Sequence, residues 1–510
     1  MVRHGGAVSQ PWAPQLDRPR SGDAVAGISV ALVLIPQSMA YAEIAGVPPY
    51  VGLLAASLPL IVAAPFVSSP YLQTGPVALT SLLTFGALSS LATPGTDEYV
   101  ALAALLALMV GVIRLGVGVT RLGVIAYLMS QPVLMGFTTG AAIVIISSQL
   151  PSALGSTPEG DGLLERAAWS LVHPGSWETA AVLLSLLTAA LTLGGRRIHR
   201  LFPGVLVAVA IGITYSHLAD YSGRVVGDLP ARLPTLTLDL PYGDAGTLVV
   251  GAVVIALVGF AEPASIARTF AAADRIPWSA DREFVSQGVA NVASAASGGF
   301  PIGGSFSRTS LNRFAGGRTR WSGALTGLVV LVFLPFATVM EGLPRAVLGA
   351  IVISVVVGLV QPVELARIWR TSPPQAVVAW TTVVATLAFS PRVERAVVLG
   401  VVLSLAVHLW RELRVEIVTA TANGVLTVHL KGVLYFFSTP GIEQRIIDLL
   451  AEHPDATEVV IDLAGVGRLD YTAANVLASV AADAKAAGLE VSLANVPAAA
   501  EVAVDRILDD

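Results

Sequence analysis

Apolar segments long enough to cross a bilayer recur through most of this chain. A helix of about 20 apolar residues spans the hydrocarbon core of a membrane, because each residue adds about 1.5 Å. We predict helices at about 22–44, 50–67, 76–91, 98–119, 122–149, 177–194, 202–218, 245–272, 281–297, 305–314, 320–338, 344–360, 375–390 and 393–412. A polar loop through Pro151 and Pro174 and a polar segment from Tyr221 to Asp244 interrupt them, and an amphipathic stretch lies at 363–369.

The pattern changes after Arg414, where short alternating runs replace the long apolar ones. We predict strands at 415–428, 433–437, 458–463 and 490–494, and helices at 442–452 and 473–487. Strands that alternate with helices are typical of a small soluble α/β domain. The predicted domains are a cytoplasmic N-terminal segment (1–21), a transmembrane domain (22–413) and this C-terminal domain (414–510).

Composition supports the membrane interpretation and excludes several classes of function. Mean hydropathy is +0.74, 54% of residues are hydrophobic and only 13% are charged, which a soluble protein does not need. The chain has no cysteine, and its seven histidines show no ligand spacing, so we predict no metal site and no cofactor. It lacks a phosphate-binding loop, a dinucleotide fingerprint and a catalytic triad. We therefore expect neither an enzyme nor a nucleic-acid partner.

Two similar stretches lie in the two halves of the apolar region. Thr74–Leu82 and Gly303–Leu311 align so that Gly75 matches Gly304 and both end in Thr-Ser-Leu. Each begins with small or hydroxyl residues and continues into a helix-compatible run. Interrupted segments at matching positions of two halves indicate the central site of a transporter. The unpaired N–H groups and the dipole of two such helix starts would form an anion pocket, to which Arg308 adds a full charge.

A second pairing supports an internal repeat. Residues 31–37 resemble residues 256–262, so Gln37 and Glu262 occupy matching places, each ahead of its half-helix by a similar number of residues. Chance similarity between Ala-rich apolar segments is the alternative. Two sets of seven helices place the second repeat in the membrane inverted relative to the first.

Arginine placement predicts the orientation of the helices. With the N-terminus inside, the cytoplasmic loops include Arg114, Arg121, Arg268, Arg275, Arg282, Arg313, Arg318, Arg320, Arg367 and Arg370. The opposite side carries mainly acidic residues, among them Asp97, Glu98, Glu165 and Glu341. An excess of Arg on one side marks the cytoplasm. We therefore expect both termini in the cytoplasm and the protein in a bacterial cytoplasmic (inner) membrane.

Three motifs in order resemble the sulfate permease (SulP) family of anion transporters. They are Ile35–Ala42 with the following Gly46–Pro49, then Thr74–Ala78, and a C-terminal segment similar to a STAS domain. Leu54 stands where many members have Tyr. The resemblance implies about fourteen transmembrane segments in two inverted seven-helix repeats. It also implies a core of helices 1–4 and 8–11, a gate of helices 5–7 and 12–14, a homodimer, and an elevator-like motion of core against gate.

Candidate substrate-binding residues come from both halves. Gln37 and Tyr41 lie one turn apart on the first helix, so both can face the core, where polar side chains usually serve function or helix pairing. By resemblance Gly75, Val77 and Ala78 line the start of the first half-helix. Phe306, Ser307 and Arg308 would line the start of the second, with Phe306 as an aromatic wall that excludes water. The alternatives are that the glycines only break the helix and that Arg308 snorkels to an interface.

Glu262 is the candidate ion-coupling residue. Burial favours its neutral acid and a nearby Arg308 favours its carboxylate, so it could exchange a proton or ligate sodium. A static pair of Glu262 with Arg308 is the alternative. A sodium site would need a second oxygen ligand one turn on, where this chain has Ile266, although Ser265 is adjacent. We therefore favour proton symport.

In the C-terminal domain Thr472 lies near a predicted helix start. Its hydroxyl is expected to cap that helix, and in anti-sigma factor antagonists the matching position is phosphorylated, so Thr472 is also a candidate regulatory site.

For the whole chain we predict a secondary transporter of an anion of the sulfate, bicarbonate, chloride or dicarboxylate class. Open alternatives are a sodium-coupled symporter, an anion exchanger, a nucleobase permease of the same architecture, and a membrane sensor or voltage-driven motor.

Overall fold

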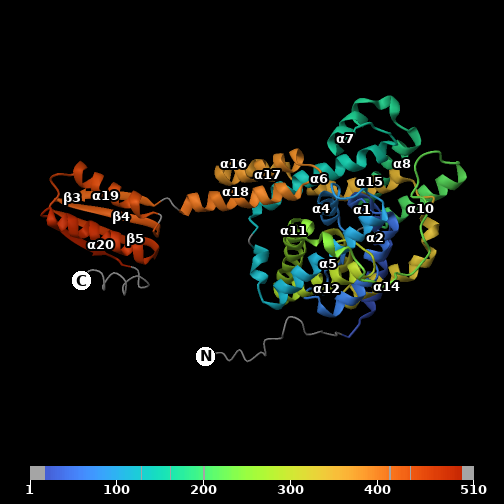
Figure 1. The fold of residues 1–510 in the computed structure, drawn as a ribbon, viewed down its shortest axis with the longest axis horizontal. Coiled ribbons are helices and arrows are strands. Elements are labelled where there is room, and N and C mark those ends of the chain that lie inside the picture. Colours follow the sequence, from blue (N-terminus) through green and yellow to red (C-terminus); the bar gives the residue numbers. More distant parts are fainter. Residues whose placement is uncertain are drawn as a thin grey trace. The chain divides into compact units, whose positions relative to one another are not determined.

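The computed structural model describes residues 18–127, 129–160, 162–198, 202–412, 415–436 and 438–496 (Figure 1). The chain forms two compact units, residues 1–402 and residues 403–510. Most of the predicted N-terminal segment, the predicted domain boundary at 413–414 and the predicted strand end at Phe437 lie outside the described residues.

The first unit is helical apart from two very short strands. Its first half contains α1 (Ser21–Ala45), α2 (Pro49–Ala55), α3 (Leu58–Ala63), β1 (Thr74–Gly75), α4 (Ala78–Leu88), α5 (Asp97–Val119), α6 (Gln131–Leu154), α7 (Leu163–Val172), α8 (Thr179–Ala189), α9 (Gly195–Ile198) and α10 (Gly204–Leu218). Its second half contains α11 (Ala245–Asp274), α12 (Ala280–Ala296), β2 (Gly303–Gly304), α13 (Phe306–Phe314), α14 (Trp321–Phe333), α15 (Arg345–Val356), α16 (Pro362–Thr371), α17 (Pro373–Ala388) and α18 (Glu394–Glu412). Seven described helices are long and apolar enough to cross a membrane, and three shorter apolar helices accompany them.

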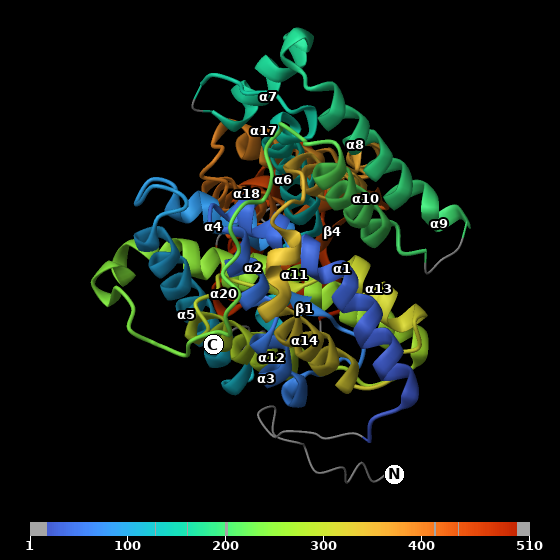
Figure 2. The ribbon, with the colours of Figure 1, turned by 90° about the vertical axis from the view of Figure 1, so that its right-hand side faces the viewer.

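These helices pack in two groups. In the core, α5 packs on α12 and α11, and α1 packs on α14, α2, α4 and α13. In the gate, α6 packs on α17, α15 and α7, and α8 packs on α15. The two groups meet where α1 contacts α15 and α10 and where α4 contacts α6. Figure 2 shows α7 and α8 at one end of the unit and α3 and α12 at the other, with β1 near the middle of the core.

Helix ends follow local chemistry, and two predicted boundaries were wrong. Gly46, in the left-handed region at φ 80°, ends α1 as its C-cap. The helix predicted from 122 begins only at Gln131, because Pro132 lacks an N–H group and suits only the first turn of a helix. The segment predicted as a loop after Pro151 contains α7, an amphipathic helix. It was missed because it is short and lies in a segment interrupted by prolines.

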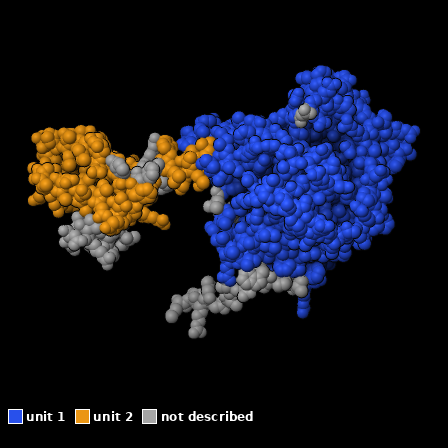
Figure 3. All heavy atoms as spheres, in the orientation of Figure 1, with its two compact units in different colours: residues 1–402 blue, residues 403–510 orange. Residues whose placement is uncertain are grey.

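The second compact unit, residues 403–510, is coloured orange in Figure 3. It contains β3 (Glu416–Ala422), β4 (Val425–Leu434), α19 (Thr439–Glu452), β5 (Glu458–Leu469), α20 (Tyr471–Ala486) and β6 (Glu490–Ala494). The sheet order is β3-β4-β5-β6, with β3 antiparallel to β4 and the remaining pairs parallel. The strand predicted at 415–428 is in fact a hairpin. It turns at Asn423-Gly424, where both residues have positive φ, as a tight two-residue turn requires.

One face of that sheet is covered by α19 and α20, which bury Leu449 and Leu477 against Val428 and Ile461. Asp462, on β5, accepts hydrogen bonds from Asn495 and from the Ala464 N–H and pairs with His429 at 2.7 Å. These bonds, led by the one from Asn495, hold the pKa of the Asp462 carboxyl below its usual range.

Candidate anion-binding site

The two half-helices begin side by side. β1 and β2 pair antiparallel, with Thr74 opposite Gly304 and Gly75 opposite Gly303. The Ser305 N–H also donates to the Gln73 carbonyl at 3.0 Å. Each two-residue strand leads into a helix, so α4 and α13 start from one shared pair of strands. The N–H groups of both helix starts are therefore close to a common centre.

Polar side chains of α12 hold this pair of strands in place. Gln287 donates to the Thr74 hydroxyl at 2.7 Å. Asn291 accepts from the Ile302 N–H at 2.9 Å and donates to the Ile302 carbonyl at 3.1 Å, just ahead of β2. Both side chains are buried. These residues were missed by sequence analysis, although polar residues at 287, 291 and 294 form a stripe on one face of a membrane helix.

Arg114 corrects the predicted arrangement of cytoplasmic arginines. It was placed in a loop, but it lies within α5 and is fully buried. Its guanidinium donates to the carbonyls of Ile255, Ala256 and Ile302 at 2.9–3.1 Å. This side chain therefore joins α5 to α11 and to the segment before β2.

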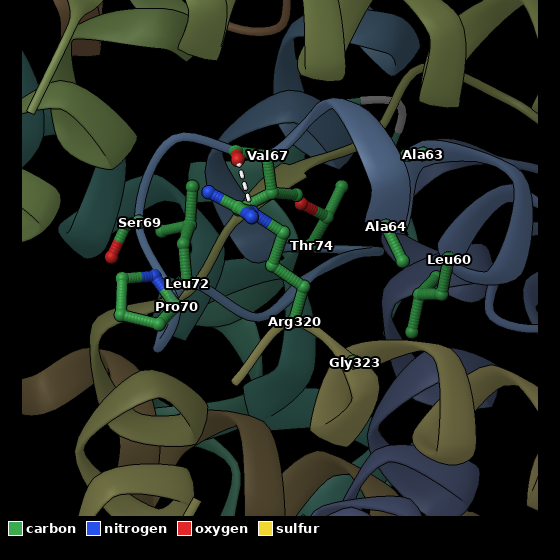
Figure 4. A pocket seen from close by; sticks show the side chains of 10 residues that line it. All are labelled: Leu60, Ala63, Ala64, Val67, Ser69, Pro70, Leu72, Thr74, Arg320 and Gly323. Atoms are coloured by element: carbon green, nitrogen blue, oxygen red, sulfur yellow. Dashed lines mark hydrogen bonds between the residues drawn. The ribbon is translucent and has the colours of Figure 1, made fainter. Parts of the chain in front are cut away.

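A small cavity lies behind β1 (Figure 4). Its volume is about 10 Å³, and Arg320, Thr74 and Ser69 are among the residues that line it. The Arg320 guanidinium crosses the cavity and donates to the Val67 carbonyl at 2.7 Å. This space is at most large enough for one water molecule, so it is not the place where an anion of the predicted class would bind.

Arg308 lies in the first turn of α13 and is fully buried. A Cβ built on Gly75 would lie 3.5 Å from Nη2 of Arg308, so the guanidinium lies directly against β1. Among the described residues none forms a hydrogen bond with any of its three guanidinium nitrogens. A buried cation whose donors are all unused is costly unless a ligand completes it.

Two of the predicted residues lie close enough to Arg308 to interact with its charge. Glu262 on α11 and Tyr41 on α1 both interact with its charge, and the Phe306 backbone N–H lies by the Glu262 carboxylate. Glu262 and Arg308 do not form an ion pair within 4.0 Å in the described part of the chain. Tyr41 is 3% exposed, whereas Glu262 is half-buried.

The remaining predicted residues lie at or near the helix starts. Val77 is the extended N-cap residue of α4 and Ala78 its first residue, and both are buried. Gln37 is buried on α1, the helix that packs on α4 and α13, and its Oε1 has no hydrogen-bond partner among the described residues. Ser307 is half-buried, with its hydroxyl 3.3 Å from that of Ser305.

Phe306 does not enclose a pocket in this structure. Its ring is 55% exposed and stacks on Phe270 with centroids 6.3 Å apart.

The predicted cap at Thr472 was wrong. Thr472 is exposed at the second position of α20, and the cap is Asp470, whose Oδ1 accepts from the Ala473 N–H at 2.8 Å. A carboxylate one residue before the helix serves as well as a hydroxyl.

Family models match nearly the whole described chain. The model of the sulfate permease family matches residues 21–383, and that of the STAS domain matches residues 416–507. A probable sulfate transporter of Mycobacterium tuberculosis is 35% identical over 396 residues, which is 74% of this chain and 70% of that protein.

Solved structures agree with this fold. Murine solute carrier 26 family member A9, an anion transporter in the inward-facing state, superposes with a TM-score of 0.87 at 20% identity. The match covers 96% of this chain and 88% of that one. The transmembrane domain of a cyanobacterium bicarbonate transporter matches with a TM-score of 0.67 at 25% identity, over 76% of this chain and 99% of that one. The predicted fold is confirmed: a polytopic helical membrane protein of two seven-helix repeats with a C-terminal STAS domain.

Proposed function

Because the chain belongs to the sulfate permease family of anion transporters, we propose that it is a secondary active transporter that binds its anion between the starts of α4 and α13. The substrate is a small anion of the sulfate, bicarbonate, chloride or dicarboxylate class. One observation carries the proposal. Arg308 is fully buried at this place, and among described residues its guanidinium has no hydrogen-bond partner.

The backbone supplies the rest of the attraction. Helix N-termini carry about half a positive charge and present free N–H groups. Here two helix starts share one strand pair, Thr74–Gly75 with Gly303–Gly304. Gly75 has φ 145°, a backbone conformation that residues with a side chain rarely adopt, and its backbone lies against the guanidinium. The neutral wall of the pocket is then formed by Gln37, Tyr41, Val77, Ala78 and Ser307. The Phe306 N–H lies by the Glu262 carboxylate.

Transport itself follows an elevator-like motion of core against gate. Both strands and both half-helices belong to the core, and the core contacts the gate chiefly through α1 and α4. A rigid core that carries the anion past the gate would expose it first on one side and then on the other. The functional unit is a homodimer in a bacterial cytoplasmic membrane, with both termini in the cytoplasm.

Glu262 couples the anion to a proton. Its carboxylate competes with the anion for the charge of Arg308, so protonation strengthens anion binding, and the anion in turn favours protonation. Ile266, where a second sodium ligand would stand, is buried and apolar, and Ser265 is exposed. Both features favour a proton over sodium.

The test is uptake of each of the four anions into proteoliposomes under an imposed pH or sodium gradient. We expect an inward proton gradient to concentrate one of them. Glu262→Gln mimics the protonated acid, so it should still exchange anion but should not concentrate it. Glu98→Gln, an exposed glutamate at the start of α5, is the matched control and should behave like the wild type.

Each alternative has its own outcome. Uptake driven by sodium and indifferent to pH would replace the proton with sodium. Accumulation by Glu262→Gln at the wild-type level would reject this residue. Exchange without accumulation by the wild type would indicate an exchanger. A nucleobase permease would not need a buried Arg308 or a STAS domain, and uracil flux without anion flux would favour it. Absence of all flux would favour a sensor or motor.

A further inference from the structure

A second, larger cavity lies between helices of the core and helices of the gate. Its volume is about 620 Å³. The core side is formed by the end of α1 and the second half of α4, including Glu43 and Phe85. The gate side is formed by α6, α7, the segment before α11, and the start of α15. None of the residues assigned above to the central site lines it.

This cavity is rich in arginine. Arg166 on α7, Arg224 in the segment after α10 and Arg345 at the start of α15 line it, against the carboxylates of Glu43 and Asp228. All three arginines come from the gate side. The balance of charge therefore favours an anion, and the cavity walls concentrate the field.

One of the three arginines is already engaged. Nε of Arg345 lies 3.3 Å from Glu43 across the core–gate boundary and donates to the Val225 carbonyl at 3.1 Å. Arg166 and Arg224 differ from it. Arg166 is half-buried and Arg224 is exposed, and in the described part of the chain neither guanidinium forms an ion pair. Two cations thus line one cavity without an ion-pair partner among the described residues.

Gln149 gives a sign that the cavity holds a hydrogen-bond donor, such as water or the hydroxyl of a bicarbonate ion. It lies on α6, is 6% exposed and lines the same cavity. Its Nε2 donates to the Ser148 hydroxyl at 3.2 Å, but its Oε1 has no hydrogen-bond partner in the described structure. A buried amide with an unused polar atom is normally completed by water or by a ligand.

We propose that this cavity is a second anion-binding site, in which Arg166 and Arg224 hold a small inorganic anion. An anion that carries a hydroxyl, such as bicarbonate, can in addition donate that hydroxyl to Oε1 of Gln149. The site is separate from Arg308 and captures the anion at the core–gate boundary. Its anion is of the same class as the proposed substrate. The binding test below does not depend on transport.

The absence of cysteine from the chain allows a clean reporter. Ser152 lines the cavity on α6, and Ser152→Cys would be the only thiol. N-ethylmaleimide is neutral, but it reacts with the thiolate, whose fraction depends on the nearby arginines and on salt. The labelling is therefore done at constant pH and at constant ionic strength balanced with gluconate, so that slowing by the test anion reports its occupancy of the cavity. At about twice the dissociation constant, sulfate, chloride or bicarbonate should slow labelling about threefold, since one-third of the sites remain empty.

Further variants on this background locate the site. Arg166→Gln with Arg224→Gln should abolish the protection. Arg121→Gln, an exposed arginine outside the cavity, should leave it unchanged. Arg308→Ala should also leave the half-protecting concentration unchanged, even if it stops transport. Protection that vanishes in Arg308→Ala but survives in the double variant would place the anion at the centre and overturn the proposal.

Lipid phosphate has the same chemistry as a soluble oxyanion. The labelling is therefore done in detergent without added phospholipid, where only the soluble anion is present. Protection that appears only after phosphatidylglycerol is added would overturn the soluble anion as ligand. Failure of all three anions to slow labelling would overturn the site itself, whatever the proteoliposome flux shows.

Discussion

The starts of α4 and α13 share one strand pair but differ in chemistry. At α4 the N-cap is Val77, whose side chain makes no cap hydrogen bond, and the first turn is apolar or hydroxylic. At α13 the N-cap is Ser305, whose hydroxyl accepts from the Arg308 N–H, and the same turn carries Arg308 itself. In the repeat alignment Arg308 corresponds to Leu79, which is buried. One half of the repeat thus offers only backbone donors, and the other adds charge.

The supports of the two strands come from different helices. β1 is held by the bond from Gln287 of α12 to Thr74, and the segment before it by Thr309 of α13, whose hydroxyl accepts from the Gln73 N–H at 3.1 Å. The segment before β2 is held by Asn291 on both its N–H and its carbonyl, and by Arg114 on the carbonyl. The supports of β2 therefore come from α12 and α5, whereas those of β1 come from α12 and from α13, the helix that carries the charged residue. A binding group needs such support, because its geometry must be set before the ligand arrives.

The largest expected effect comes from removing the support of β2. Asn291→Leu leaves the buried Ile302 N–H without its acceptor, which costs about 1–3 kcal/mol, and loses a further bond worth about 1 kcal/mol. We expect a loss of about 2–4 kcal/mol in the free energy of unfolding, measured by denaturant titration in mild detergent. Gln287→Leu, the matched change at β1, should cost about 1 kcal/mol. Equal losses of unfolding free energy in Asn291→Leu and Gln287→Leu would contradict the proposed difference between the supports of β2 and β1.

The next effect concerns the glycines. Gly75 has φ 145°, where a side chain is strained, so Gly75→Ala should cost about 1–3 kcal/mol and weaken anion binding by shifting β1 against Arg308. At Gly304 the obstacle is space, since a Cβ would meet Cδ1 of Leu72 at 2.8 Å and the ring of Pro263 at 3.0–3.1 Å. The Leu72 side chain can move, but the Pro263 ring is part of α11 and gives way only if that helix shifts. We therefore expect Gly304→Ala to cost about 1–3 kcal/mol through overpacking, and the same titration with a binding measurement compares the two glycines.

The smallest effect comes from the cap. Ser305→Ala removes the hydroxyl that accepts a hydrogen bond from the Arg308 N–H at 3.5 Å. We expect the free energy of unfolding, measured by the same denaturant titration, to fall by about 0.5–1 kcal/mol. Ser81→Ala, in the first turn of α4, removes a buried hydroxyl that has no partner among the described residues. That change should be neutral or slightly stabilising. A larger loss from Ser81→Ala than from Ser305→Ala would contradict the assignment of the caps.

The repeat could be predicted from the sequence, because each half-helix begins with glycine followed by a run of residues typical of a helix. It also identified Arg308 as a candidate, since a charge at a membrane helix start is rare, and the role of this residue stays a prediction. The positions of Arg114 and the support from Asn291 were not predictable in the same way. Hydropathy counts residues along the chain, whereas both roles depend on which carbonyls another helix presents. The Asn423-Gly424 hairpin, by contrast, had a clear local signal that the strand pattern overrode.

The central claim is that Arg308 holds the anion between two helix starts. The most direct test is calorimetry of the equilibrium binding of the transported anion to the purified protein. The proteins compared are the wild type, Arg308→Ala, Arg308→Lys and Leu79→Met, each first shown to unfold at the same temperature as the wild type. We expect Arg308→Ala to weaken binding about 10- to 100-fold through the loss of a charge-assisted hydrogen bond. Arg308→Lys should fall between, since it lacks the planar fork, and Leu79→Met should bind like the wild type. An unchanged dissociation constant in folded Arg308→Ala would contradict the account.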